Sequence, residues 1–368
     1  METKSGILRR ILIANRSLWD CESTKAHIRR NFQKVIDCRT RALGAVVYDT
    51  ASGERMLRYN TCKCRSCPSC GYWSTIRWQA EVAAFLPDTN FCNVVFTMPP
   101  EFWKIFKMNK HLLHDLPAIG AGVLQDWAMD RFGAEIAALV FCHTFGYALE
   151  FKPHLHILVS STGLRARGSR LVRALHFPRD MIRERWRASL LQYVAQAFKE
   201  GKLSTDLSSL EFADLLEENR YRWWNVGSEA NVPKFRVVKY LSRYLRRLPI
   251  AESHIESFDS NEIRICTKDT RERKQVSLGL LKREFFARIS DHQWEHYQHA
   301  VRYFGLLAPR AINTRFRLFL RCLGQVWRNR PRPLRWADSI RKHYKCDPLL
   351  SRNGERFFQV GVLPPKRD

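Results

Sequence analysis

Hydrophobic residues recur at two different spacings along the chain, and these spacings predict its helices and strands. Apolar positions three or four residues apart predict helices over residues 25–36, 180–199 and 237–247. Short apolar or alternating runs predict strands at residues 93–98, 262–266 and 274–279. The mixture predicts an α+β fold.

Two β-rich runs in the middle of the chain, residues 137–149 and 151–161, follow each other almost directly. Runs this close in sequence are expected to pair as antiparallel neighbours. We therefore expect the centre of the fold to be an antiparallel sheet backed by helices.

Breaks in the pattern predict three parts. Residues 1–86 precede a turn-rich stretch that begins at Pro87, residues 87–310 hold the predicted sheet, and residues 311–368 form a basic tail. Residues 301–368 carry 16 Lys and Arg against four Asp and Glu, a net charge of +12. Such a segment is either solvated and poorly ordered, or it binds DNA. Docking of this segment is favoured by its aromatic residues Trp327, Trp336 and Phe358.

The whole chain is strongly basic, with 62 Lys and Arg against 36 Asp and Glu and a pI near 10.0. This balance predicts a polyanionic partner, nucleic acid above all, rather than a small-molecule substrate. The longest apolar runs, such as residues 134–142, are too short to span a membrane. Arginines interrupt the N-terminal apolar residues, so we expect no secretory signal and a cytoplasmic protein.

Four of the 11 cysteines crowd into nine residues: Cys62, Cys64, Cys67 and Cys70. In a reducing compartment this crowding indicates a metal site rather than a disulfide framework. The four thiols could hold one tetrahedral zinc ion, or three of them could do so with Cys38 or His27.

A second candidate metal site lies in the later β-rich run, where His154 and His156 are two residues apart. The pleat of a strand points both imidazoles to one face. A histidine pair alone can also be a solvated strand face. The best third ligand is His143, which an antiparallel pairing with a turn near Leu149 would place opposite His156.

Tyr240 and Tyr244 are four residues apart and so share one face of a predicted helix. A tyrosine can attack a phosphodiester and form a covalent phosphotyrosine, and neighbouring guanidinium groups favour the phenolate and hold phosphate. The arginines beside this pair are Arg243, Arg246 and Arg247. Without the histidines, the simpler interpretation is an amphipathic helix that packs two aromatic rings.

These residues together resemble the HUH-type (histidine, hydrophobe, histidine) two-tyrosine transposases of the insertion sequence 91 and 801 kind. The resemblance covers roughly residues 35 to 310 and follows the order of the motifs along the chain. The motifs are CRT from Cys38, YNTCKCRSCPSCG from Tyr59, FTMPPEFW from Phe96, HTFG from His143, FKPHLHILVSSTGL from Phe151, YLSRY from Tyr240 and VRYFGLLAPR from Val301.

The resemblance implies a rolling-circle transposase that nicks and rejoins single-stranded DNA at the ends of a mobile element. The histidines would hold Mg²⁺ or Mn²⁺, and Tyr240 or Tyr244 would form a 5′-phosphotyrosine. The N-terminal zinc domain would recognise element-end DNA, and a target DNA would be the second partner. It also implies a bacterial protein, associated with the nucleoid when bound to DNA. Lys152 stands where relatives often have a histidine, and its ammonium could contact the phosphate or weaken metal binding.

Three other functions compete with this one. A replication initiator or conjugative relaxase uses the same chemistry, but the cysteine-rich N-terminus favours a transposase. A catalytically decayed protein would retain only zinc-dependent DNA binding. A zinc hydrolase built on His154 and His156 is disfavoured because no further ligand follows directly in sequence.

Overall fold

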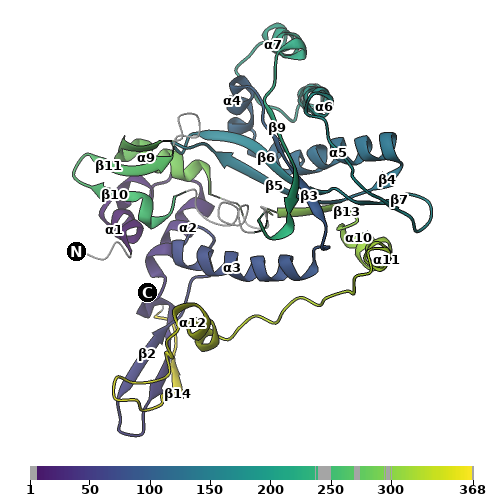
Figure 1. Ribbon diagram of the computed structural model, residues 1–368. Helices are drawn as coiled ribbons and strands as arrows, with labels where there is room; N and C mark the ends of the chain where they lie inside the picture. Colours follow the sequence, from purple (N-terminus) through teal and green to yellow (C-terminus); the bar gives the residue numbers. More distant parts are fainter. Residues whose placement is uncertain are drawn as a thin grey trace.

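The structure, a computed structural model, describes residues 6–236, 238, 250–268, 274–293, 295, 299 and 301–366. Its central antiparallel sheet has the strand order β13-β5-β6-β3-β9 (Figure 1). The predicted hairpin is confirmed at its centre. The strands are β3 (Asn90–Phe96), β5 (Ala137–Phe145), β6 (Phe151–Ser160), β9 (Val226–Pro233) and β13 (Val301–Gly305).

Helices cover one face of this sheet and enclose the largest hydrophobic core. Phe96 stacks on Trp186 in this core, with ring centroids 4.8 Å apart. Gly120 lets its helix, residues 116–132, approach the middle of β6, because a Cβ at position 120 would lie 2.5 Å from the Leu155 side chain. The helices are α4 (Pro100–Met108), α5 (Leu116–Phe132), α6 (Arg179–Lys199) and α7 (Ser209–Tyr221).

The opposite face carries a second core, formed with α3 (Pro68–Phe85), α10 (Pro309–Ile312) and α11 (Arg315–Cys322). Trp78 of α3 meets Phe141 of β5 edge-on, with centroids 5.7 Å apart. Because both faces are covered, β5 is buried along almost its whole length. This double burial explains its nearly unbroken apolar sequence.

A third core joins the N-terminal helices to a later part of the chain. Helices α1 (Ile7–Ala14) and α2 (Ala26–Asp37) pack with the sheet of β10 (Ile255–Phe258), β11 (Glu262–Lys268) and β12 (Gln275–Leu281), and with α9 (Lys282–Asp291). These elements lie beside one another in Figure 1. Cys67 and Cys70 belong to the same core, so the cysteine-rich region packs with residues near position 10 and with residues beyond position 250.

The basic C-terminal segment folds back onto the N-terminal region (Figure 1). Strand β14 (Phe358–Leu363) pairs with β1 (Ala45–Asp49), which also pairs with β2 (Arg55–Tyr59). Helix α12 (Trp336–Tyr344) packs beside this sheet, where the Arg58 guanidinium lies 5.0 Å from the Trp336 ring. A further small sheet has β4 (Ala134–Glu135), β7 (Gly163–Arg165) and β8 (Leu171–Val172).

Most of the predicted elements are present within a few residues of their expected bounds. The expected helices at residues 25–36 and 180–199 are α2 and α6, and the expected strands are β3, β11 and β12. The helix predicted at 237–247 lies almost wholly outside the described residues. The cores do not follow the predicted divisions at residues 86 and 310, because α3, α9 and β14 each pack across them.

Candidate metal centres

Three histidines gather on the inner hairpin of the central sheet. One ring nitrogen from each of His143, His154 and His156 lies within 4.8 Å of the others. His143 comes from β5 and the other two from β6, and all three point to the face that α3 covers. The structure therefore brings the predicted pair together with the predicted third residue, and we call these residues the histidine triad.

The strand register differs from the expected one by two residues. His143 lies opposite His154, and Phe141 lies opposite His156, whereas we expected His143 opposite His156. The turn is centred near Ala148 and Leu149, about one residue earlier than expected, and the register also shifts between His143 and Phe145. A slip of two residues keeps side chains on the same face, so the triad forms despite the wrong register.

The triad consists of neutral imidazoles. Burial lowers the pKa of His143 well below its usual value, that of His154 to about 4 and that of His156 to about 3. His154 donates from Nδ1 to the carbonyl of Lys152 at 2.7 Å, which leaves its Nε2 as a lone-pair donor. His143 Nε2 and His156 Nδ1 are buried with no hydrogen-bond partner. Such nitrogens fit a bound divalent cation.

A glycine lies in line with the triad two strands away. In the row of residues that runs through His156, the neighbours are Phe141, Val95 and then Gly227, which has no side chain. Tyr240, Tyr244, Arg243, Arg246 and Arg247 lie outside the described residues. The segment that leads to them follows β9, and Val238 packs into the core on the triad's face of the sheet.

Lys152 alternates onto the same side of β6 as the two histidines. Its ammonium lies 5.4 Å from the centroid of the Trp103 ring. Its backbone carbonyl, rather than its side chain, contacts the triad through His154. The predicted phosphate contact of Lys152 remains a prediction.

Four cysteines form a second cluster where α2, β2 and α3 meet. The sulfurs of Cys38, Cys62, Cys67 and Cys70 all lie within 4.8 Å of one another. Cys67 caps the N-terminus of α3 and Cys70 is in its first turn, where the helix dipole favours thiolates. The Cys62 thiol lowers the pKa of Cys38 to about 7, and the Cys38 thiol lowers the pKa of Cys70. Four thiol ligands support a closed, structural zinc site.

The structure corrects the assignment of Cys64 as a zinc ligand. Its Sγ lies 3.7 Å from Asn31 Oδ1 and is not part of the cluster, where Cys38 takes the fourth place. Its backbone N–H instead donates to Cys62 Sγ at 3.4 Å. The Cys64 thiol thus faces α2, which carries Asn31. His27 also lies outside the cluster.

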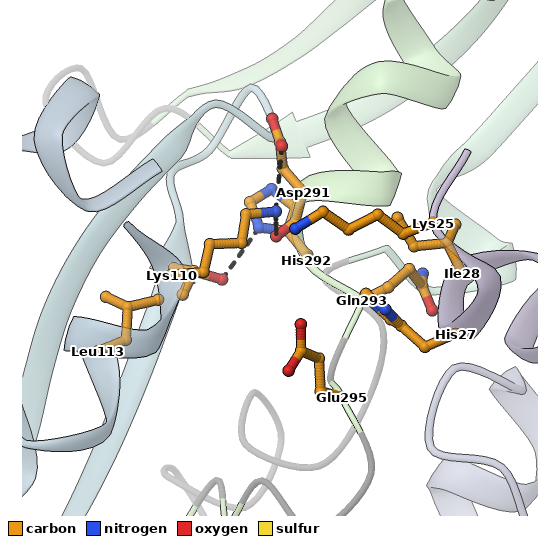
Figure 2. A pocket seen from close by; sticks show the side chains of 10 residues that line it. Lys25, His27, Ile28, Lys110, Leu113, Asp291, His292, Gln293 and Glu295 are labelled. Atoms are coloured by element: carbon orange, nitrogen blue, oxygen red, sulfur yellow. Dashed lines mark hydrogen bonds and ion pairs between the residues drawn. The ribbon is translucent and has the colours of Figure 1, made fainter. Parts of the chain in front are cut away.

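A basic groove opens beside the cysteine cluster. It lies between α2 and the cysteine loop, and its cationic residues are Arg30, Lys34, Lys63 and Arg65. A second hollow shares His27 and Glu295 with this groove and continues to Lys25 and Lys110 (Figure 2). Thr144, the residue after His143, also lines this hollow. Sequence spacing gave no sign that these residues meet.

Comparisons with known proteins match both halves of the chain. Residues 12–98 match the transposase zinc-binding domain of insertion sequence IS91, and residues 138–315 match a family described as "Putative transposase". The chain is 30% identical to the putative transposase y4qJ of Sinorhizobium fredii over 291 residues, 74% of this chain and 72% of that protein. The chain belongs to the IS91/IS801-type transposases.

A second relative supports this family. The transposase for insertion sequence element IS801 of Pseudomonas savastanoi is 29% identical over 287 residues, which cover 75% of this chain and 69% of that protein. No solved structure matches the chain. As a transposase, the protein is a DNA-processing enzyme with DNA as its partner, and its cysteine cluster lies inside the matched zinc-binding domain. In the part of the chain that is described, no helix is both long and apolar enough to cross a bilayer.

Proposed function

We propose that this transposase nicks and rejoins single-stranded DNA at the ends of its mobile element by tyrosine transesterification, as in rolling-circle transposition. The observation that carries the proposal is the histidine triad: three neutral imidazoles on two adjacent strands, of which His143 is buried and the other two are half-buried, with two unpartnered ring nitrogens. The family membership favours a transposase over a replication initiator or relaxase.

The proposed chemistry conserves the bond energy of the phosphodiester, because one phosphate ester is exchanged for another. The phenolate oxygen of Tyr240 or Tyr244 attacks the phosphorus, a 5′-phosphotyrosine ester forms, and the bond to the 3′ oxygen breaks. That oxygen takes up a proton and becomes a free 3′-hydroxyl. In the joining step a 3′-hydroxyl attacks the phosphotyrosine, restores a phosphodiester and releases the tyrosine. The second tyrosine would serve this later transfer.

The triad's residues fit a divalent cation. His143, His154 and His156 would hold Mg²⁺ or Mn²⁺, and the bound ion would polarise the scissile phosphate. Three neutral imidazoles are better ligands for Mn²⁺ than for Mg²⁺, which prefers oxygen. Three protein ligands leave coordination positions for phosphate oxygens. The same imidazoles stay unprotonated at neutral pH because burial lowers the pKa of each.

The basic groove supplies a path for the DNA strand. Arg30 and Lys34 are four residues apart on α2 and face the cysteine loop, which carries Lys63 and Arg65. Cations on both walls suit a single negatively charged backbone. The hollow shared through His27 and Glu295 extends this path to Thr144 near the end of β5. The zinc-binding domain would thus bind the DNA next to the hairpin that holds the triad.

The decisive experiment is a search for a covalent protein–DNA product. The protein is incubated with labelled single-stranded element ends and Mn²⁺ or Mg²⁺, and the products are separated on a denaturing gel. We expect an adduct that disappears in the Tyr240→Phe, Tyr244→Phe double variant, and the single variants show which tyrosine attacks first. Tyr221→Phe is the matched control, because Tyr221 is 76% exposed at the end of α7.

Two outcomes would contradict the proposal. The absence of any adduct, despite tight binding to several candidate ends, would leave a DNA-binding protein without strand-transfer activity. An adduct that persists in the double variant would place the nucleophile on another residue.

A further inference from the structure

A buried pair of residues, His292 and Gln293, lies between the two metal centres. They follow directly after α9 and are 4% and 5% exposed. Neither belongs to the triad or to the cysteine cluster. Polar side chains buried this deeply need hydrogen-bond partners, and the partners of these two lie on opposite sides.

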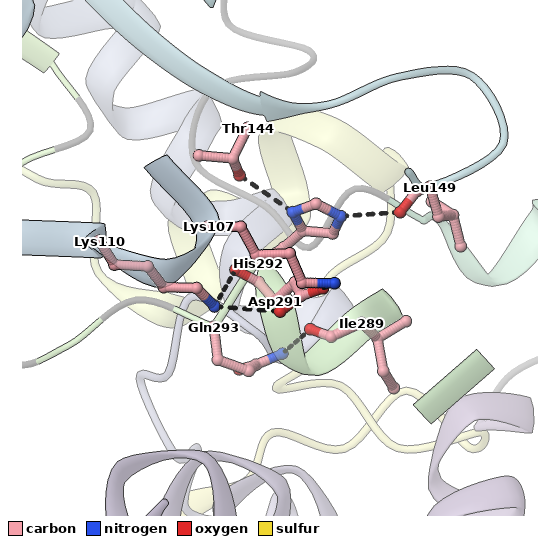
Figure 3. A network of polar contacts seen from close by, with 8 residues as sticks. All are labelled: Lys107, Lys110, Thr144, Leu149, Ile289, Asp291, His292 and Gln293. Atoms are coloured by element: carbon pink, nitrogen blue, oxygen red, sulfur yellow. Dashed lines mark hydrogen bonds and ion pairs between the residues drawn. The ribbon is translucent and has the colours of Figure 1, made fainter. Parts of the chain in front are cut away.

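His292 holds the hairpin that carries the triad. Its Nε2 lies 3.0 Å from the carbonyl of Leu149, in the β5–β6 turn, and its Nδ1 lies 3.0 Å from Thr144 Oγ1, next to His143 (Figure 3). A carbonyl only accepts, so Nε2 carries the proton. Burial lowers the pKa of His292 to about 4, and the neutral ring accepts the Thr144 hydroxyl at Nδ1.

The same part of the chain fixes the rest of the turn. Arg288 of α9 donates to the carbonyl of Ala148, and Thr267 of β11 donates to the carbonyl of Tyr147 at 2.7 Å. Leu149 itself has a φ of 62°, in the left-handed region, so the backbone of the turn is strained. Its conformation therefore depends on partners outside the hairpin.

Gln293 reaches in the other direction, to the cysteine loop. Its Oε1 accepts from Ser66 Oγ at 2.5 Å and from Asn31 Nδ2 at 3.4 Å. Ser66 directly precedes the cluster residue Cys67. Asn31 also accepts from the thiol of Cys64, the cysteine that the cluster leaves out. Gln293 Nε2 donates back to Ile289 of α9, which fixes the side chain (Figure 3).

We propose that His292 and Gln293 are positioning residues that couple the zinc loop to the histidine triad. An ordered cysteine loop holds Gln293, the adjacent His292 then holds Thr144 and Leu149, and these two fix the strands on which His143 and His154 lie opposite each other. The zinc domain would therefore set the geometry of the triad in addition to binding DNA. The metal part of this inference rests on the proposed function.

The test compares substitutions along this bridge in the full-length, zinc-loaded protein. The variants are His292→Leu, Thr144→Val and Ser66→Ala, and the readouts are Mn²⁺ affinity by calorimetry and hydrogen exchange at the amides of residues 144–151. We expect His292→Leu to weaken Mn²⁺ binding by about tenfold or more, as loss of a residue that orients metal ligands typically does. Ser66→Ala should act in the same direction, more weakly, without loss of zinc.

Asn219→Leu is the matched control, because Asn219 is 1% exposed and also loses a buried hydrogen bond, but it lies in α7. It should leave both readouts unchanged. If His292→Leu does not fold, Thr144→Val tests the same contact with a side chain of equal shape. Folded variants with wild-type Mn²⁺ affinity and wild-type hairpin exchange would overturn the proposal.

Hydrogen exchange keeps this test separate from the proposed function. A wild-type protein that binds no Mn²⁺ at the triad would contradict the proposed metal chemistry. Faster exchange of the hairpin in Ser66→Ala would still support the coupling in that case, and unchanged exchange would still reject it.

Discussion

The cysteine cluster and the histidine triad are both compact sets of metal-binding side chains, but they are built in opposite ways. The cysteines come from a loop and the ends of two helices, and backbone N–H groups donate to two of their sulfurs. The histidines come from adjacent strands of the central sheet, and two of their ring nitrogens are buried without partners.

This difference separates a site that holds the fold together from one that can receive a ligand. Four thiols complete a tetrahedral shell and leave no open position, which is typical of structural zinc. Three imidazoles leave positions free, and paired strands of the central sheet, rather than an ion, bring them together. Substitutions at the two sites should therefore have different consequences for stability and for chemistry.

Loss of one cluster cysteine should lower the stability of the protein more than any other substitution considered, because the cluster links α2, β2 and α3. We expect Cys67→Ser to lose zinc and to lower the Tm by on the order of 10 °C, since structural zinc contributes folding free energy directly. Cys64→Ser is the control and should keep its zinc and its Tm, because the Cys64 thiol lies outside the cluster. Zinc content by mass spectrometry and thermal melts measure the effect. A Cys64→Ser protein without zinc would break the contrast between the two cysteines.

At the triad, substitution should affect chemistry far more than stability. We expect His156→Ala to lower the rate of adduct formation by about 10³-fold or more, because the ion that polarises the phosphate is lost. DNA binding should persist, since it rests on phosphate contacts spread over the basic surface. His176→Ala is the control, on an exposed histidine that packs against Phe132. Parallel loss of cleavage and binding in His156→Ala would mean that the triad also holds the DNA.

Acid should destabilise the metal-free protein through the triad. Histidines titrate near 6.5 in an unfolded chain, whereas burial lowers the pKa of His154 to about 4 and that of His156 to about 3 in the folded protein. Between these values the unfolded chain binds protons that the folded protein does not, so stability falls as the pH falls. We expect the Tm to decline from about pH 6.5 to pH 4, and less steeply in a His154→Gln, His156→Gln variant. Identical slopes would contradict the lowered pKa values of His154 and His156.

The smallest effect is expected in the basic groove. Lys63→Ala should weaken DNA binding a few-fold and reduce the slope of log affinity against log salt concentration by about one, as the loss of one phosphate contact does. Lys199→Ala, at the end of α6 on the far face of the sheet, should leave the slope unchanged. Equal slopes for both variants would remove Lys63 from the DNA path.

Local patterns predicted the central fold well. The apolar runs of β5 and β6 and the helical periodicity of α2 and α6 are each visible within one segment, and all four elements are present. The pairing of β14 with β1 was not predictable in this way, because it joins segments about 300 residues apart. The third core, in which α1 and α2 pack with α9, was unpredictable for the same reason, because its elements are far apart in the sequence.

The candidate sites show the same limit. Strand alternation was enough to place His154 and His156 on one face, and His143 joined them because a two-residue error in register preserves the face. Spacing could not separate Cys64 from Cys62, because the direction of each thiol depends on how the loop packs against α2. No sequence pattern marks His292 or Gln293, whose role comes only from partners distant in the chain.

The pairing of β14 with β1 has a consequence for the synthesis of the protein. A ribosome that has just made β1 must add about 300 residues before β14 exists. At about 5 to 20 residues per second, this takes roughly 15 to 60 seconds. During that interval one edge of β1 has no strand to pair with, and an exposed edge can pair with a strand of another chain. Newly made copies on the same messenger RNA are therefore at greatest risk of association before the last strand emerges.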